Sequence, residues 1–220
     1  MQGTRLLPLS GSAFVALVLV AVIGLSGGAP EGVVPGAEVI AYFDDNEVEQ
    51  FVATFVWTAA VPFLVLFALS VAAVGRPDAD RTRVWERLLV GGSLLVGATL
   101  LVSAMVNLSL VDGAANGASP AAMEALHLSI ANAWVAWNAG LGVMMLGAAG
   151  TLLAEPRTHA WLGWVALPTG VALFFPVADF FGMVVTLAWI VVASVVLYRA
   201  ERATRYAAAP TTACLPRLDR

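Results

Sequence analysis

Residues 121–154 read AAMEALHLSIANAWVAWNAGLGVMMLGAAGTLLA, and the part from Leu128 to Ala154 carries no charged side chain. A transmembrane helix needs about 20 consecutive, mostly apolar residues, so this run is long enough to cross a bilayer. Its N-terminal end is also unusually polar, because His127, Asn132 and Asn138 lie there among tryptophans. The stretch therefore predicts a membrane-spanning helix, and it is the place where chemistry inside the membrane is most expected.

The composition is that of a membrane protein. Of the 220 residues, 60% are hydrophobic and 12% are charged, whereas a soluble domain is about one quarter charged. The apolar residues lie in long uncharged runs, which a soluble core does not require. No basic patch indicates nucleic acid binding, and the single cysteine, Cys214, excludes an intramolecular disulfide.

Six apolar segments alternate with polar loops. We expect an all-α bundle of six transmembrane helices within residues 1–200, at about 8–29, 47–75, 86–110, 121–154, 159–177 and 181–199, followed by an arginine-containing, disordered tail at 201–220. One helix over residues 160–198 would measure about 58 Å, so a turn near Pro176 to Gly182 is predicted to divide them. Asn46 marks the start of the second span, and Ser119-Pro120 marks the start of the fourth as an N-cap followed by proline.

Two segments before residue 47 need separate interpretation. The apolar run from Leu6 to Ala29 is predicted to be a retained transmembrane helix, and the alternative is a cleaved signal peptide, which would leave five spans. Apolar residues at Val39, Ile40 and Phe43 suit a short helix that lies at the membrane interface.

The arginines define the expected orientation. Loops 76–87 and 155–159 and the C-terminal region hold nearly all of them, whereas loops 30–50, 111–123 and 176–182 hold none. Because basic residues concentrate on the cytoplasmic side of a membrane, both termini are predicted to be cytoplasmic.

The aromatic residues agree with this register, since tryptophan and tyrosine gather at the two membrane interfaces. We expect Trp57, Trp134 and Trp137 near the outer interface and Trp85, Trp161, Trp164 and Tyr198 near the inner one. Trp189 alone is predicted near the middle of the membrane.

Four polar residues are predicted near the outer ends of the spans: His127, Asn138, Asn107 and Asp179. On one helix over 121–154, His127, Trp134 and Asn138 fall on a single stripe. If the four side chains meet in an outward-facing vestibule, a His–Asp pair there can bind a cation or a polar headgroup, or relay protons. The alternative is that helix ends carry polar residues because they project into water, and that the deeper Asn138 bonds a neighbouring helix.

Several activities are excluded by what the chain lacks. There is no lysine for a retinal Schiff base, and the two histidines, His127 and His159, are predicted on opposite sides, which excludes a bis-histidine haem. A two-cysteine redox site needs a second cysteine. No Gly-x-Ser-x-Gly elbow and no His-Glu-x-x-His motif occurs. We therefore predict no catalytic residue, no metal site and no cofactor.

The order of these features resembles a known group of proteins. Ala41-Tyr42-Phe43-Asp44-Asp45-Asn46 leads into the second span, an arginine loop follows, and the fifth span opens with His159-Ala160-Trp161-Leu162-Gly163-Trp164. Together they resemble a family of small six-span bacterial membrane proteins, common in actinobacteria, that carry a domain of unknown function. The resemblance covers roughly residues 8–200. It implies a location in the cell's inner (plasma) membrane and no established activity, so it assigns no functional residue.

Two functions remain open from the sequence. The first is a non-enzymatic module that binds a membrane partner protein, a second copy of itself, or lipid. The alternative is a small transporter or channel subunit, which Pro62, Pro168 and the outer polar residues favour. A continuous polar path through the bundle would favour transport, convergence of His127 and Asp179 on a closed pocket would favour an enzyme or ligand site, and an apolar core would favour the module.

Overall fold

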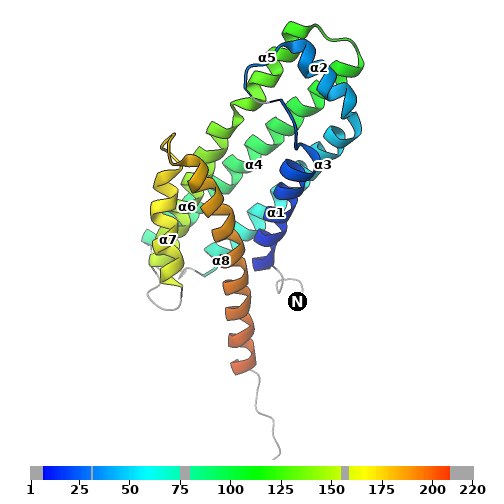
Figure 1. The fold of residues 1–220 in the computed structure, drawn as a ribbon. Coiled ribbons are helices and arrows are strands. Elements are labelled where there is room, and N and C mark those ends of the chain that lie inside the picture. The colour runs from blue at the N-terminus through cyan, green and yellow to red at the C-terminus, as the bar shows by residue number, and fades with distance from the viewer. Residues whose placement is uncertain (1–6, 31, 75–79, 155–158, 209–220) are drawn as a thin grey trace, which may run out of the picture.

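The computed structural model describes residues 7–30, 32–74, 80–154 and 159–208, and within these ranges the chain is helical and contains no strand (Figure 1). The helices are α1 (Ser10–Leu19), the π-helix η2 (Val20–Leu25), α2 (Gly36–Asp45), α3 (Glu47–Ala72), α4 (Asp80–Ala115), α5 (Pro120–Ala131), α6 (Ala133–Leu153), α7 (Ala160–Ala172) and α8 (Asp179–Ala208). Among the described residues, five helical segments are long and apolar enough to cross a membrane: Leu7–Leu25, Glu47–Ala72, Arg83–Ala115, Pro120–Leu153 and Asp179–Ala203. The sixth apolar helix, α7, has 13 residues and falls short of that length.

Large apolar side chains cover the outside of the long helices. On α4 the exposed series runs from Trp85 to Met105, about 30 Å of helix, and beyond it the exposed residues Ser109 and Asp112 are polar. This apolar length matches the hydrocarbon thickness of a bilayer. The outer surface of the bundle is therefore suited to lipid rather than to water.

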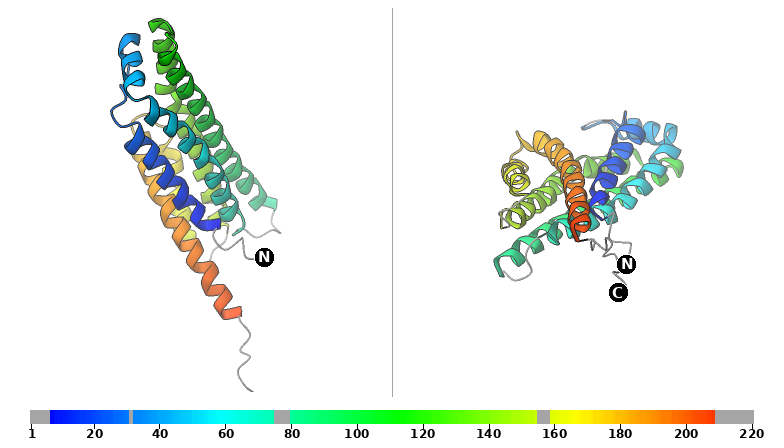
Figure 2. Two further views of the ribbon diagram at one scale, coloured as in Figure 1. Left: turned by 90° about the vertical axis from the view of Figure 1, so that its right-hand side faces the viewer. Right: turned by 90° about the horizontal axis from the view of Figure 1, so that it is seen from below.

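Three elements form a separate cap beyond this apolar belt. The cap consists of α2, α5 and the C-terminal end of α4, which lie together at one end of the molecule (Figures 1 and 2). They share a small apolar cluster of Val39, Phe43, Leu110, Val111 and Met123. The short helix predicted at residues 37–43 is present as α2, but Val39 and Phe43, two of its apolar residues, are buried against protein. Its location at the membrane interface stays a prediction.

The predicted single helix over 121–154 is two helices. Asn132 interrupts it with φ −93° and ψ −3°, and its side-chain amide donates to the carbonyl of Leu128 at 2.8 Å. Asparagine side chains compete in this way with the helical hydrogen-bond ladder. The interruption breaks the predicted stripe, since Trp134 is exposed whereas His127 and Asn138 are buried.

Several other predicted boundaries differ from the structure, since α4 begins at Asp80 rather than near 86 and α7 ends at Ala172 rather than near 177. Helix α4 extends to Ala115 rather than ending near 110, because its last turns pack into the cap. Helix α8 continues to Ala208, so residues 201–208 of the predicted disordered tail are helical, and residues 209–220 lie outside the described residues. A turn divides α7 from α8 as predicted, but it covers residues 173–178, whereas residues 179–182 of the predicted turn belong to α8.

Glycines bring α4 and α6 into close contact. A Cβ atom on Gly92 would collide with the backbone of Met144, and one on Gly147 would collide with the backbone of Leu89. Small residues at these positions let the two helices pack closely. Close packing matters in a bilayer because the hydrophobic effect does not drive helices together there. The first helix is equally integrated, since a Cβ on Gly11 would collide with side chains of α3 and α8, and Phe14 is fully buried.

Candidate functional site

All four polar residues predicted at the outer ends are buried. Their exposed fractions are 4% for Asn107, 5% for His127, 4% for Asn138 and 7% for Asp179. The expectation that helix ends carry polar residues because they project into water therefore does not hold for His127 and Asp179, whereas Asn138 bonds a neighbouring helix as expected. The structure nevertheless divides them among three separate places instead of one vestibule.

Asn138 and Asp179 form the first place, between α6 and the start of α8. The amide Nδ2 of Asn138 donates to Oδ2 of Asp179 at 3.3 Å, and the backbone N–H of Phe180 donates to Oδ1 at 2.7 Å. Asp179 is the first residue of α8, where free N–H groups and the helix dipole stabilise a carboxylate. The side-chain oxygen Oδ1 of Asn138 is buried and has no hydrogen-bond partner among the described residues.

Asn107 belongs to a second network that ties four elements together. Its amide Nδ2 donates to the backbone carbonyl of Gln50 at 3.0 Å and to Oγ1 of Thr54 at 3.1 Å. The side chain of Gln50 then donates to the carbonyl of Leu25 at 3.0 Å and to the hydroxyl of Tyr42 at 2.8 Å. The network links the end of η2, helix α2, the start of α3 and the outer part of α4.

Sequence reasoning missed Gln50, Thr54 and Tyr42. The available signal was the pair Gln50 and Thr54, which lie four residues apart on one face at the start of an apolar helix. Polar side chains in that position need partners, which neighbouring helices supply here. Burial, and then the negative charge of Glu49, raise the pKa of the Tyr42 phenol above its usual value of 10.0, so this member of the network is neutral at physiological pH.

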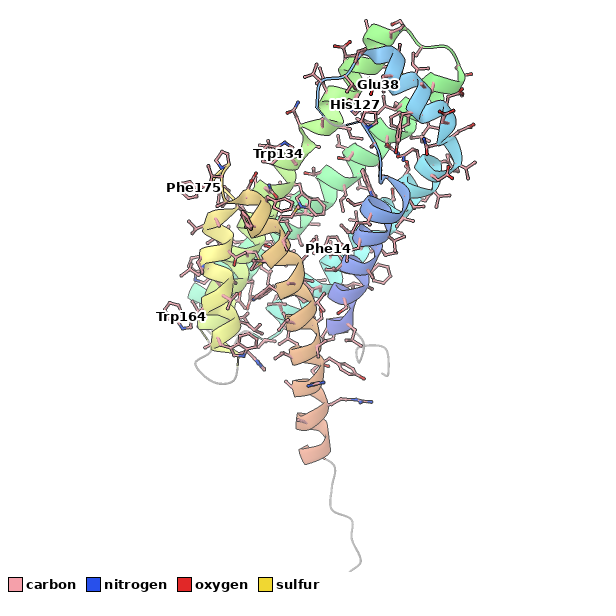
Figure 3. All side chains as sticks on the ribbon, viewed as in Figure 1. Phe14, Glu38, His127, Trp134, Trp164 and Phe175 are labelled. Carbon is pink, nitrogen blue, oxygen red and sulfur yellow. The ribbon has the colours of Figure 1, made fainter. Side chains whose placement is uncertain are left out.

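His127 occupies the third place, in the cap on α5 (Figure 3). It lies one helical turn after Met123 of the cap cluster, and its Nε2 is buried with no hydrogen-bond partner among the described residues. No hydrogen bond or ion pair found in the described ranges joins it to Asp179. The hypothetical His–Asp pair is therefore not formed.

The described residues contain no group of three or more histidine, cysteine, aspartate or glutamate side chains placed to hold a metal ion. With two separate hydrogen-bond clusters and one isolated histidine, the arrangement brings no nucleophile, base and oxyanion donors together. Two buried side-chain atoms of the four candidates, Asn138 Oδ1 and His127 Nε2, have no hydrogen-bond partner among the described residues.

No protein-family model matches the chain, and no significant similarity to a curated protein or to a solved structure is found. The resemblance to the six-span bacterial family stays a prediction.

Proposed function

We propose that this chain is a six-span protein of a bacterial inner (plasma) membrane, with both termini in the cytoplasm, and that it acts without catalysis as a module that binds a membrane partner. The cap then lies on the outer side, where a partner's extracytoplasmic segment can reach it.

The charge distribution supports this orientation. Ten of the eleven arginines fall in three parts of the sequence: residues 76–87, at and before the start of α4, residues 155–159 before α7, and residues 199–220 at and after the end of α8. They are Arg76, Arg81, Arg83, Arg87, Arg157, Arg199, Arg202, Arg205, Arg217 and Arg220. The start of α1 and the end of α8 lie at one end of the bundle, opposite the cap (Figure 1). An even number of crossings follows from that arrangement, which supports counting the short α7 as a span.

The observation that carries the proposed role is the apolar character of the bundle between its two ends. Five of the buried hydroxyls there each donate to a carbonyl of their own helix at 2.7 to 2.9 Å, those of Ser93, Thr151, Thr169, Thr186 and Ser194. The buried ionisable residues of the described ranges are His127 and Asp179, and both lie toward the cap. The described residues form no continuous line of polar side chains from one side of the bundle to the other. This favours a binding module over a transporter. Pro62 and Pro168 lie inside continuous helices and do not break them.

The cap surface indicates the kind of partner. Seven carboxylates lie on the cap elements and the adjoining start of α3: Glu38, Asp44, Asp45, Glu47, Glu49, Asp112 and Glu124. No arginine occurs between residues 30 and 75 or between residues 88 and 156. Such a surface attracts a basic partner segment and repels anionic lipid headgroups.

Native mass spectrometry of protein released from membranes in a gentle detergent tests this role. We expect a stoichiometric bound partner that is lost when Glu38, Asp44 and Asp45 are changed together to Gln, Asn and Asn, since all three are exposed. The matched control changes exposed neutral cap residues, Ala37→Ser and Ala41→Ser, and should keep the partner. An apo monomer in the wild-type spectrum, or a partner indifferent to the charge change, would count against the module.

A second candidate, a small transporter or channel subunit, is favoured by the unpartnered Asn138 oxygen beside the buried carboxylate of Asp179. This reading predicts a cation flux in proteoliposomes that Asp179→Asn abolishes. Equal flux in wild type and variant would remove it.

A further inference from the structure

The turn between α7 and α8 exposes a group of large apolar side chains. They are Phe174, Phe175, Val177, Phe180 and Phe181, and Val177 is 92% exposed. The one charged residue of this segment, Asp179, points the other way and is buried against Asn138. A turn in water normally carries the opposite pattern, with polar residues outside.

The length of α7 places this turn below the outer membrane surface. Trp161 and Trp164 are exposed at the start of the helix and mark the interface on the arginine side. From Trp161 to Leu173 the helix rises about 18 Å, well short of the hydrocarbon thickness of about 30 Å. Tilt of the helix would shorten this rise further.

The contact with α6 independently places the turn below the outer interface. Trp134 is exposed at the start of α6, near the expected outer interface (Figure 3). Asn138 lies four residues deeper, a rise of about 6 Å. Since Asn138 bonds Asp179 directly, the start of α8 lies at that depth as well.

The backbone of the turn is nearly self-sufficient in hydrogen bonds. The N–H groups of Phe174, Phe175, Ala178 and Asp179 donate to backbone carbonyls of the turn and of the end of α7 at 2.9 to 3.1 Å. Pro176 has no N–H, and among the described residues the N–H of Val177 is the one in the turn for which no acceptor is found. The N–H of Phe180, which begins α8, donates to the carboxylate of Asp179. Backbone polar groups must be satisfied within the protein wherever lipid replaces water.

We propose that the α7–α8 turn is a lipid anchor, seated in the outer leaflet at the boundary between headgroups and acyl chains, with its phenylalanines and Val177 among the acyl chains. Asp179 then serves to bind the N–H of Phe180 in the first turn of α8 out of reach of water. This inference rests on the membrane-crossing position of α7 given under the proposed function, and it adds the depth of the turn and its lipid contact.

The test measures the depth of a single cysteine in native membranes. Cys214 is first changed to Ser, and Val177→Cys is compared with Ala121→Cys, whose side chain is exposed on the cap. A membrane-impermeant maleimide needs a hydrated thiolate, so we expect Val177→Cys to react at least about tenfold more slowly than Ala121→Cys. After denaturation in detergent both should label fully, which shows that each cysteine is competent.

A spin label on the same cysteine provides the second measurement. At position 177 its collisions with oxygen, which concentrates in lipid, should exceed those with a water-soluble nickel complex, and at position 121 the order should reverse. Equal labelling rates together with a water-like collision pattern at 177 would overturn the anchor. Failure of the orientation itself would look different, because Ala121→Cys would then label from the cytoplasmic side only.

Discussion

Substitution of Gln50 by leucine tests whether the first helix is fastened to the cap through a single side chain. Gln50 is only 2% exposed, and its side-chain amide donates to both the Leu25 carbonyl and the Tyr42 hydroxyl. Leucine has a similar volume and removes both donors without a cavity. The backbone carbonyl of Gln50 stays in place, so the two hydrogen bonds from Asn107 should persist.

The magnitude follows from the two lost hydrogen bonds. Each contributes about 1 kcal/mol net, so Gln50→Leu should lower the free energy of unfolding by about 2 kcal/mol, a factor of about 30 in the equilibrium constant. The partners left behind, a buried carbonyl and a phenol, lose their hydrogen-bond donor, which adds to this cost.

Reversible unfolding in mixed micelles, followed by far-ultraviolet circular dichroism against the mole fraction of denaturing detergent, measures this free energy. Val48→Leu is the matched control, because Val48 is exposed on the same helix and should change the free energy by less than about 0.5 kcal/mol. If Gln50→Leu behaves like the control, the network does not fasten the first helix, and the structural interpretation of Gln50 is refuted.

Three further predictions concern packing, pH and processing. Gly92→Ala should destabilise the bundle by about 1–3 kcal/mol, because the added Cβ collides with the backbone of α6. The control Gly91→Ala, whose Cβ meets no atom within 4 Å, should be neutral or mildly stabilising. The same unfolding measurement compares the two variants, and equal effects would contradict the close α4–α6 contact. The pKa of Tyr42 is raised in the folded state, so its stabilising contribution is complete below the unfolded pKa of 10.0 and is lost as the pH rises through the folded pKa. Wild type should therefore lose stability above about pH 10 relative to Tyr42→Phe. Parallel pH profiles of the two proteins would contradict the raised pKa. Because Gly11 and its helix pack into the core, the purified protein should have the intact mass of the full chain, and a mass lacking residues 1–29 would show that the first helix is removed.

Local features of the chain were predictable because they depend on neighbouring residues. Ser119 and Pro120 begin α5 as expected, and the Ser119 hydroxyl accepts from the N–H of Ala122 at 3.4 Å. Asn46 precedes α3 as expected, yet its side chain donates backwards to Tyr42 instead of capping the new helix. Position along the chain was therefore easier to predict than the partner of a side chain.

The tryptophans show the same distinction. Trp134, Trp161 and Trp164 are exposed, as interfacial residues are expected to be. Trp137 was predicted with them but is 9% exposed and stacks on Phe14, 123 positions earlier, with ring centroids 6.2 Å apart. Trp189, predicted within the membrane, is buried and donates to the carbonyl of Leu162 at 2.9 Å.

The sequence by itself determined that the chain is helical, that its long apolar runs suit a membrane, and where several helices begin, because hydropathy, charge and capping act over a few residues. Only the tertiary structure decided that α2 turns its apolar face to the protein, that Asp179 meets Asn138 rather than His127, and that Gln50 holds the end of the first helix. These pairings depend on how far each helix is rotated and shifted against its neighbours, which close contacts such as Gly92 against Met144 set across the whole bundle. A shift of one residue on a helix turns a side chain by about 100°, so no local pattern could have selected the partners.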